Sequence, residues 1–350
     1  MSGEFLEPSE KELDSEIDRL VSAGLPSLGY GERQLEETAL LTWKINRLKK
    51  KRGIVIPAHV YQRAEVLVGV ADIRGDSYKL ARDCGSVSAA GILFCGVRFM
   101  AETAKILNPE KDVYLPAEEA GCSLADSIGA EDVRALKRSH PGLPVVSYIN
   151  TTAEVKAESD VIVTSANAVK ILNWMYARHP QIIFLPDAYM GRNLARQLGK
   201  KVGRDMIVWD GKCVVHENFD PASVSYYRKV YPGVKILAHA ECSPALIEAV
   251  DFVGGTGDMM RFVRETNAPG YMMVTECGLG EHARTEMPGK RFIPMCRLCP
   301  YMKATDLKRI LDVLERPRKE HRVTVPAAVA KKAKASIDRM FEIAEGRAGE

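Results

Sequence analysis

The 350-residue sequence has no apolar run that approaches the ~18 residues of a membrane span. It has little excess charge of one sign, because 49 lysines and arginines face 46 aspartates and glutamates. The densest basic run is residues 49–52, which fall where a helix should end. Because cations are favourable at the C-terminal end of the helix dipole, we interpret this run as a solvated helix end and not as a nucleic-acid-binding element. The N-terminus is acidic and unlike a signal peptide. These absences predict a cytoplasmic globular protein that binds neither membranes nor nucleic acid.

Local cysteine pairs of the kind found in structural zinc sites are scarce. The chain has eight cysteines, but only Cys296 and Cys299 have the CxxC spacing. In a cytosolic protein, that many cysteines indicate metal or redox chemistry more than structural disulfides. We expect Cys84, Cys95 and Cys277 to be packed as small apolar side chains.

The chain repeats itself with a period of roughly 90 residues. Three strand-like runs end on His59, Asn150 and His239, which lie 91 and 89 residues apart. Each run is followed by a helix-compatible stretch, an acidic residue, a short apolar run and a small hydroxyl residue. The acidic residues are Asp72, Asp160 and Asp251. Strands that alternate with helical stretches predict α/β units with parallel sheets and helices on both faces.

A second marker keeps the same period. Cys122, Cys213 and Cys299 each follow the last strand of a copy and lie 91 and 86 residues apart. Ligands of such sheets bind beyond the carboxyl ends of the strands, so three copies around a pseudo-threefold axis would bring three thiols to one cavity. This pattern favours a four-iron cluster held by three cysteines, with one iron left open as a Lewis acid. Zinc bound by three cysteines is the alternative.

The repeat predicts three similar three-layer αβα domains with parallel sheets in a pseudo-threefold arrangement around a central cluster site. A helical segment precedes the repeats, and a C-terminal strand and helix are expected to pack on the first of them. The predicted segments are 1–53, then the repeats 54–140, 141–230 and 231–320, and finally 321–350.

Ten motifs, taken together and in order, resemble those of the quinolinate synthetase A family. The resemblance runs from about residue 54 to 302 and continues weakly into the C-terminal helix. The motifs are AHVYQ (58–62), GDS (75–77), GVRFMAETAKILNPEK (96–111), EAGCSLAD (119–126), YIN (148–150), TSANAVKI (164–171), GKCVVHE (211–217), HAEC (239–242), GGTG (254–257) and CPYMK (299–303).

The resemblance implies an enzyme of NAD biosynthesis that condenses iminoaspartate with dihydroxyacetone phosphate to quinolinate, releasing phosphate and two waters. It implies that Cys122, Cys213 and Cys299 hold a 4Fe-4S cluster with one open iron. Cys296 is then expected to be a non-ligand that could form a reversible disulfide with Cys299. A functional link to an L-aspartate oxidase or dehydrogenase that supplies iminoaspartate is also expected.

Two carboxylates and a phosphate need hydrogen-bond donors at strand ends and helix N-termini. Glu241, two residues past His239 and on the same face of an extended chain, is the predicted general acid/base. Tyr61 and Tyr148 are predicted to donate to developing charge or to close the cavity. The predicted substrate-binding residues are His59, Ser77, Tyr148, Asn150, Ser165, His239, Glu241 and Thr256.

Several positions depart from the usual family pattern. Ala240 stands where the family commonly has proline, and Gly255 where it commonly has serine, which removes one hydroxyl from the expected site. Pro57 replaces a more usual leucine and removes a backbone donor from its strand. Two alternatives remain open from the sequence: another 4Fe-4S-dependent hydro-lyase, and a non-catalytic iron–sulfur redox sensor.

Overall fold

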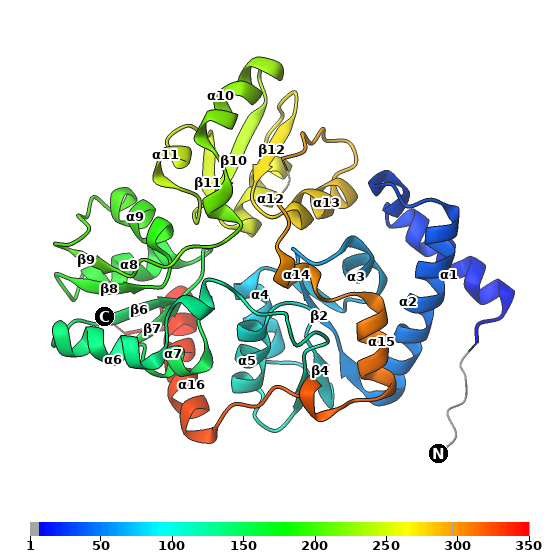
Figure 1. Cartoon of the computed structure of the whole chain (residues 1–350), viewed down its shortest axis with the longest axis horizontal. Coiled ribbons are helices and arrows are strands. Elements are labelled where there is room, and N and C mark those ends of the chain that lie inside the picture. The colour runs from blue at the N-terminus through cyan, green and yellow to red at the C-terminus, as the bar shows by residue number, and fades with distance from the viewer. Residues whose placement is uncertain (1–6, 296, 350) are drawn as a thin grey trace.

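The structure is a computed structural model that describes residues 7–295 and 297–349. Figure 1 shows three α/β lobes around a common centre, with the N-terminal helices at one side. Every pair of named strands in the described residues is parallel. The predicted α/β class with parallel sheets and helices in layers is confirmed. No helix in the described ranges is long and apolar enough to cross a membrane.

Two helices precede the repeats. Helix α1 (Glu10–Ser22) begins at a capping box, in which Ser9 and Glu12 each accept the backbone N–H of the other. Helix α2 (Glu32–Arg52) ends at Gly53, whose φ of 63° is left-handed. The basic run does end this helix as predicted, but Lys49 is buried and its Nζ lies 2.7 Å from Asp72 Oδ1.

The first repeat differs from its prediction at one strand. The single strand expected at residues 54–58 is interrupted at Pro57. The part before Pro57 pairs with β4, and the part from Pro57 onward pairs with β3 and contacts the segment after β4 only through the Ala58–Cys95 bridge. Proline has no N–H to continue one ladder through this point. The elements are β1 (Ile54–Val55), β2 (Pro57–His59), α3 (Ala64–Gly69), β3 (Ile73–Gly75), α4 (Ser77–Cys84), β4 (Gly91–Leu93), α5 (Arg98–Leu107) and β5 (Asp112–Tyr114).

The second repeat forms a four-stranded parallel sheet in the order β7-β6-β8-β9. Its central strands are fully buried, as expected of a parallel sheet with helices on both faces. The elements are α6 (Ala130–Ser139), β6 (Val145–Tyr148), α7 (Ala153–Ala157), β7 (Val161–Val163), α8 (Ala168–Tyr176), β8 (Ile182–Leu185), α9 (Ala188–Gln197) and β9 (Met206–Val208).

The third repeat forms a three-stranded sheet in the order β11-β10-β12. The strand expected at 291–294 is reduced to one bridge, made by Tyr271 N to Arg291 O and Ile293 N to Tyr271 O. The elements are α10 (Pro221–Val230), β10 (Lys235–His239), α11 (Pro244–Ile247), β11 (Phe252–Gly254), α12 (Thr256–Glu265), β12 (Tyr271–Val274), α13 (Cys277–Glu286) and α14 (Pro300–Lys303).

The acidic residue that marks each repeat has the same structural task in all three. Its carboxylate accepts a backbone N–H at or near the start of the central strand, and its own N–H donates back to that segment. The donor–acceptor pairs are Ile56 with Asp72 at 2.8 Å, Val145 with Asp160 at 2.7 Å and Ile236 with Asp251 at 2.9 Å. The internal symmetry read from the sequence is therefore also present in the contacts.

The last segments return across the molecule. Helix α15 (Leu307–Glu315) lies in the predicted third repeat but packs against α2. The C-terminal strand is a single antiparallel bridge between Arg322 and Tyr114 of the first repeat. Helix α16 (Ala327–Ala344) was expected on the first repeat; it packs mainly on α7 and β7 of the second and only partly on α5 (Figure 1). Ser336 Oγ donates to Lys156 O there, so this helix ties two repeats together.

Candidate active site and metal centre

The predicted substrate-binding and catalytic residues all line one cavity. Strand ends supply these residues: His59, Tyr148 and His239 are the last residues of β2, β6 and β10. Asn150 and Glu241 lie two residues beyond the ends of β6 and β10. Tyr61, Ser77, Ser165 and Thr256 complete the predicted set on its wall. The structure thus brings together residues from all three repeats, as expected where the carboxyl ends of parallel strands meet. Their individual roles stay predictions.

Helix N-termini and unpartnered polar atoms face this cavity. Ser77 begins α4, Thr256 begins α12, and Ser165 lies three residues before α8. Asn150 Oδ1 and Thr256 Oγ1 are buried without a hydrogen-bond partner among the described residues. Because buried polar atoms normally have partners, these two oxygen atoms indicate a polar ligand that carries N–H or O–H groups. No lysine or arginine of the described chain lines the cavity, so anions would be held by N–H groups and hydroxyls.

Two histidines at equivalent strand ends share one geometry. The Nδ1 atom of His59 accepts the N–H of Tyr61 at 3.2 Å, and Nδ1 of His239 accepts the N–H of Glu241 at 3.4 Å. Burial lowers the pKa of His59 to about 3 and that of His239 to about 4. Both imidazoles are therefore neutral. At His59 the accepting Nδ1 places the proton on Nε2, where it can be donated to a ligand, whereas Nδ1 of His239 also lies 3.4 Å from Glu241 Oε1.

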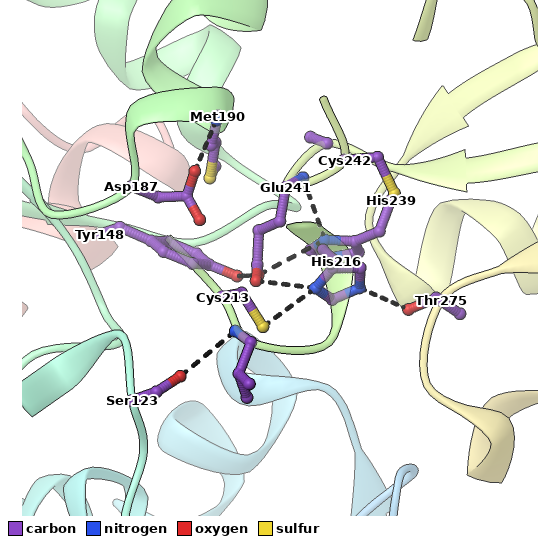
Figure 2. Close-up of polar contacts among 12 residues, drawn as sticks. Ser123, Tyr148, Asp187, Met190, Cys213, His216, His239, Glu241, Cys242 and Thr275 are labelled. Carbon is purple, nitrogen blue, oxygen red and sulfur yellow. Dashed lines mark hydrogen bonds and ion pairs between the residues drawn. The ribbon is translucent and has the colours of Figure 1, made fainter. Parts of the chain in front are cut away.

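Glu241 lies at the centre of a hydrogen-bond network that Figure 2 shows. Tyr148 Oη donates to Glu241 Oε1 at 2.7 Å, and His216 Nδ1 lies 3.0 Å from Oε2. Burial disfavours the carboxylate, but the neighbouring His216 and His239 and the hydrogen bonds from His216 and Tyr148 outweigh it and hold the pKa of Glu241 well below its usual range. The carboxylate is therefore charged when the cavity is empty.

The network continues into the first repeat. His216 Nε2 lies 2.9 Å from Thr275 Oγ1, which lies 2.6 Å from Tyr61 Oη. A chain of hydrogen bonds thus runs from Tyr61 through Thr275, His216 and Glu241 to Tyr148. Thr275 and His216 were absent from the predicted set. Thr275 directly follows β12, so the rule that selected the other strand ends could have found it.

The three equivalent cysteines line an adjoining cavity, which shares Tyr61, Asn150, Glu241 and Met302 with the first. Each cysteine carbonyl accepts the N–H of the residue four positions later. Burial raises the pKa of the Cys122 thiol to about 12, while the N–H groups of Ala125 and Leu124 act in the opposite direction. Burial also raises the pKa of the Cys213 and Cys299 thiols, and neighbouring backbone N–H groups again act in the opposite direction. Such donors favour the thiolate that a metal binds.

The spacing of the thiols suits a multi-iron cluster better than a single ion. In the described parts of the chain, only Cys213, His216 and Glu241 form a group of three ligand atoms that all lie within 4.8 Å of one another, and this group could itself hold a metal ion. The three thiols therefore form a wider triangle. Zinc–sulfur bonds of about 2.3 Å would bring them within about 4 Å of one another. The residues present thus fit an iron–sulfur cluster.

The remaining cysteines lie outside this triangle. Cys84 and Cys95 are free and fully buried, as predicted for packed side chains. Cys277, predicted to be the same, is instead disulfide-bonded. Cys299 is free, and Cys296, its predicted redox neighbour, lies outside the described residues.

Gly255, the departure from the family pattern, is explained by close packing. A Cβ atom there would lie 2.5 Å from Ser165 Oγ and 3.0 Å from Ser165 Cβ. Ser165 thus occupies the space that a serine at position 255 would need.

We predict that Gly255→Ser costs about 1–3 kcal/mol of stability through overpacking and weakens substrate binding. Chemical unfolding and the KM for both substrates measure this, and Gly255→Ser/Ser165→Ala should recover most of the stability. A fully stable single variant would contradict the packing argument.

Comparison with known proteins agrees with the geometry. A family model described as "Quinolinate synthetase A protein" matches residues 43–342. A quinolinate synthase of Sinorhizobium fredii is 44% identical over 299 residues, which cover 85% of this chain and 81% of that protein. The chain belongs to the quinolinate synthetase A family. Quinolinate synthase 2 of Mesorhizobium japonicum is 45% identical, covering 85% of this chain and 89% of the relative. The Caulobacter vibrioides quinolinate synthase is 40% identical, covering 87% and 82%.

Membership of the quinolinate synthetase A family confirms the resemblance predicted from the ten motifs. The matched region includes the three repeats and most of α16, but it omits α1 and the first part of α2. The redox-sensor and general hydro-lyase alternatives are therefore not favoured.

Proposed function

We propose that this chain is a quinolinate synthase that condenses iminoaspartate with dihydroxyacetone phosphate, releasing phosphate and two waters. One observation carries the proposal: a polar cavity lined by all the predicted substrate-binding residues adjoins a cavity lined by three equivalent thiols. The quinolinate synthases that the chain resembles over 85% of its length support the same reaction.

Substrate anions are held without cationic side chains. The N-termini of α4 and α12 face the cavity, and their backbone N–H groups and dipoles favour carboxylate and phosphate oxygens. The imidazole N–H groups of His59 and His239 and the hydroxyls of Ser77 and Ser165 add neutral donors. Asn150 and Thr256 have unsatisfied oxygen atoms that a substrate amine or hydroxyl would pair.

Glu241 acts as the general acid/base. Its low pKa in the empty cavity makes it a weak base, but substrate anions bring like charge and raise that pKa toward neutrality. His216 Nδ1–H donates to Glu241 Oε2 across 3.0 Å, so it stabilises the carboxylate between proton transfers. Tyr148 Oη, which donates to Glu241 Oε1, can donate to substrate oxygen in turn. Tyr61 lies at the other end of the same chain through Thr275.

Cys122, Cys213 and Cys299 would hold a 4Fe-4S cluster, one from each repeat. When bound, that cluster supplies an open iron whose Lewis acidity helps a substrate hydroxyl to leave. The backbone N–H groups beside each thiol would stabilise the ligating thiolates. The three cysteines themselves are partly buried. We further propose that the enzyme acts in the cytoplasm on iminoaspartate supplied by an L-aspartate oxidase or dehydrogenase.

The direct test is an anaerobic assay of the iron-loaded protein with iminoaspartate and dihydroxyacetone phosphate. Quinolinate and phosphate should appear in equal amounts, detected by chromatography and a phosphate assay. Aconitase-type hydroxy acids serve as the comparison substrates. Dehydration of those acids without any quinolinate would favour the hydro-lyase alternative and overturn this assignment.

A further inference from the structure

A buried ion pair lies at the wall of the thiol-lined cavity. Glu276 follows β12, is 1% exposed and lines that cavity. Lys303 ends α14, four residues after Cys299, and its Nζ lies 3.2 Å from Glu276 Oε1. Taking two charges out of water is costly, so a buried ion pair is by itself weak evidence for stability. The other hydrogen bonds of Glu276 and Lys303 indicate the role of this ion pair.

Each member of the pair also holds the backbone of another site residue. Glu276 Oε1 accepts the N–H of Cys299 at 3.2 Å, and Oε2 accepts the N–H of Gly278 at 2.6 Å. Lys303 Nζ donates to the carbonyl of Tyr61 at 2.6 Å. One charged unit therefore connects the backbone of a predicted cluster ligand in the third repeat to that of a predicted catalytic tyrosine in the first.

Further hydrogen bonds connect the loop after β2 to α14. Gln62 Nε2 donates to Met302 O at 2.8 Å, and Arg63 Nη2 donates to Lys303 O at 2.9 Å. A Cβ atom on Gly278 would lie 2.7 Å from the Tyr61 carbonyl oxygen, so α13 begins in direct backbone contact with the tyrosine loop. The loop after β2 is thus held against α14 and α13 at once.

We propose that Glu276 and Lys303 are positioning residues that set the Cys299 thiol and the Tyr61 hydroxyl at a fixed separation across the boundary between the third and first repeats. The inference rests on the roles proposed above for Cys299 and Tyr61. Neither charged side chain is a cluster ligand or a proton donor to substrate. Both act through the backbone of the residues they hold.

The test compares Lys303→Met, Glu276→Gln and the double variant. Each single change leaves one buried charge unpaired, so thermal stability falls, and the neutral double variant should regain it. Turnover should not recover in the double variant, because the Tyr61 carbonyl has lost its donor. In addition, the N–H groups of Cys299 and Gly278 face different oxygens of Glu276, and in glutamine one of these two positions is an NH2 group that cannot accept. We expect kcat to fall about 10–100-fold with KM changed less than about twofold. The rate of iron loss to a chelator should rise by a similar factor.

Lys290→Met is the matched control. Lys290 also donates to a backbone carbonyl, that of Thr266 at 2.6 Å, but it lies outside both cavities. Its kcat and iron retention should match the wild type. A double variant that regains stability together with kcat and iron retention would show that the pair is merely structural. Unchanged kcat and iron retention in Lys303→Met would also overturn the inference. Iron retention is read without substrate, so a wild type that makes no quinolinate would refute the proposed reaction and leave this test intact.

Discussion

Alanine at Cys122, Cys213 or Cys299 should abolish both iron binding and turnover. Each thiol comes from a different repeat, and removing one would leave only two of the three proposed anchors of the cluster. After anaerobic reconstitution, about four irons per chain are expected in the wild type and close to none in each variant. Turnover should fall by at least about a thousand-fold, because the metal's contribution to the barrier is several kcal/mol.

The other cysteines provide the controls for this result. Cys84 and Cys95 are fully buried and free, so alanine there removes only a packed sulfur and should cost about 1 kcal/mol of stability. Both variants should keep their iron and sulfide. Iron and sulfide counts together with the visible absorption of the cluster measure the outcome. Loss of the cluster in Cys95→Ala would show that the ligand set is wrong.

Glu241→Gln should lower kcat by about 10²–10⁴-fold while the iron content stays that of the wild type. The amide keeps the size of the side chain but cannot take up a proton, and it weakens the contact of 3.0 Å to His216 Nδ1. Steady-state kinetics and iron analysis of the same sample separate the two effects. KM should change less than kcat, because Glu241 is only one of the predicted substrate-binding residues and the helix N-termini and neutral donors proposed to hold the substrate anions are untouched.

Glu217→Gln is the matched control for this carboxylate. Glu217 directly follows His216 in the chain, but its side chain is exposed and lines neither cavity. The variant should retain wild-type kcat. A Glu241→Gln protein with a full cluster and full turnover would remove Glu241 from the acid/base role, and Tyr61 or His216 on the same chain would then be examined in its place.

The sequence alone was enough to predict that the proposed substrate-binding residues share one cavity, because the relevant signals are local and repeated. Two markers with one period predicted α/β repeats, and the carboxyl ends of parallel strands must meet at one edge. His59, Asn150 and His239 could therefore be assigned to one cavity before any contact was known. The same reasoning placed Cys122, Cys213 and Cys299 together. In each case, the direction of the strand determines at which edge of the sheet the residue lies. That direction follows from the hydrophobic pattern and from the order of strands and helices along the chain.

Contacts between distant segments could not be read in the same way. Tyr61 and Thr275 are separated by 214 residues, and Lys303 reaches Tyr61 across 242. Helix α16 packs mainly on the second repeat because its buried face fits α7 and β7, a match of shapes that composition does not reveal. Periodicity also missed the break at Pro57, where one apolar run serves two sheets.

The three thiols show most clearly which features follow from the sequence and which depend on tertiary packing. Their equivalence is a property of the chain, because a period of roughly 90 residues puts a cysteine after the last strand of each copy. Their triangle is a property of packing, because its width depends on how closely three separate sheets approach one another. Among the described residues the three thiols do not all lie within 4.8 Å of one another, and this supports the proposed cluster. The hydrogen bonds that orient Glu241 and the ion pair that holds Cys299 likewise exist only once the repeats are in contact.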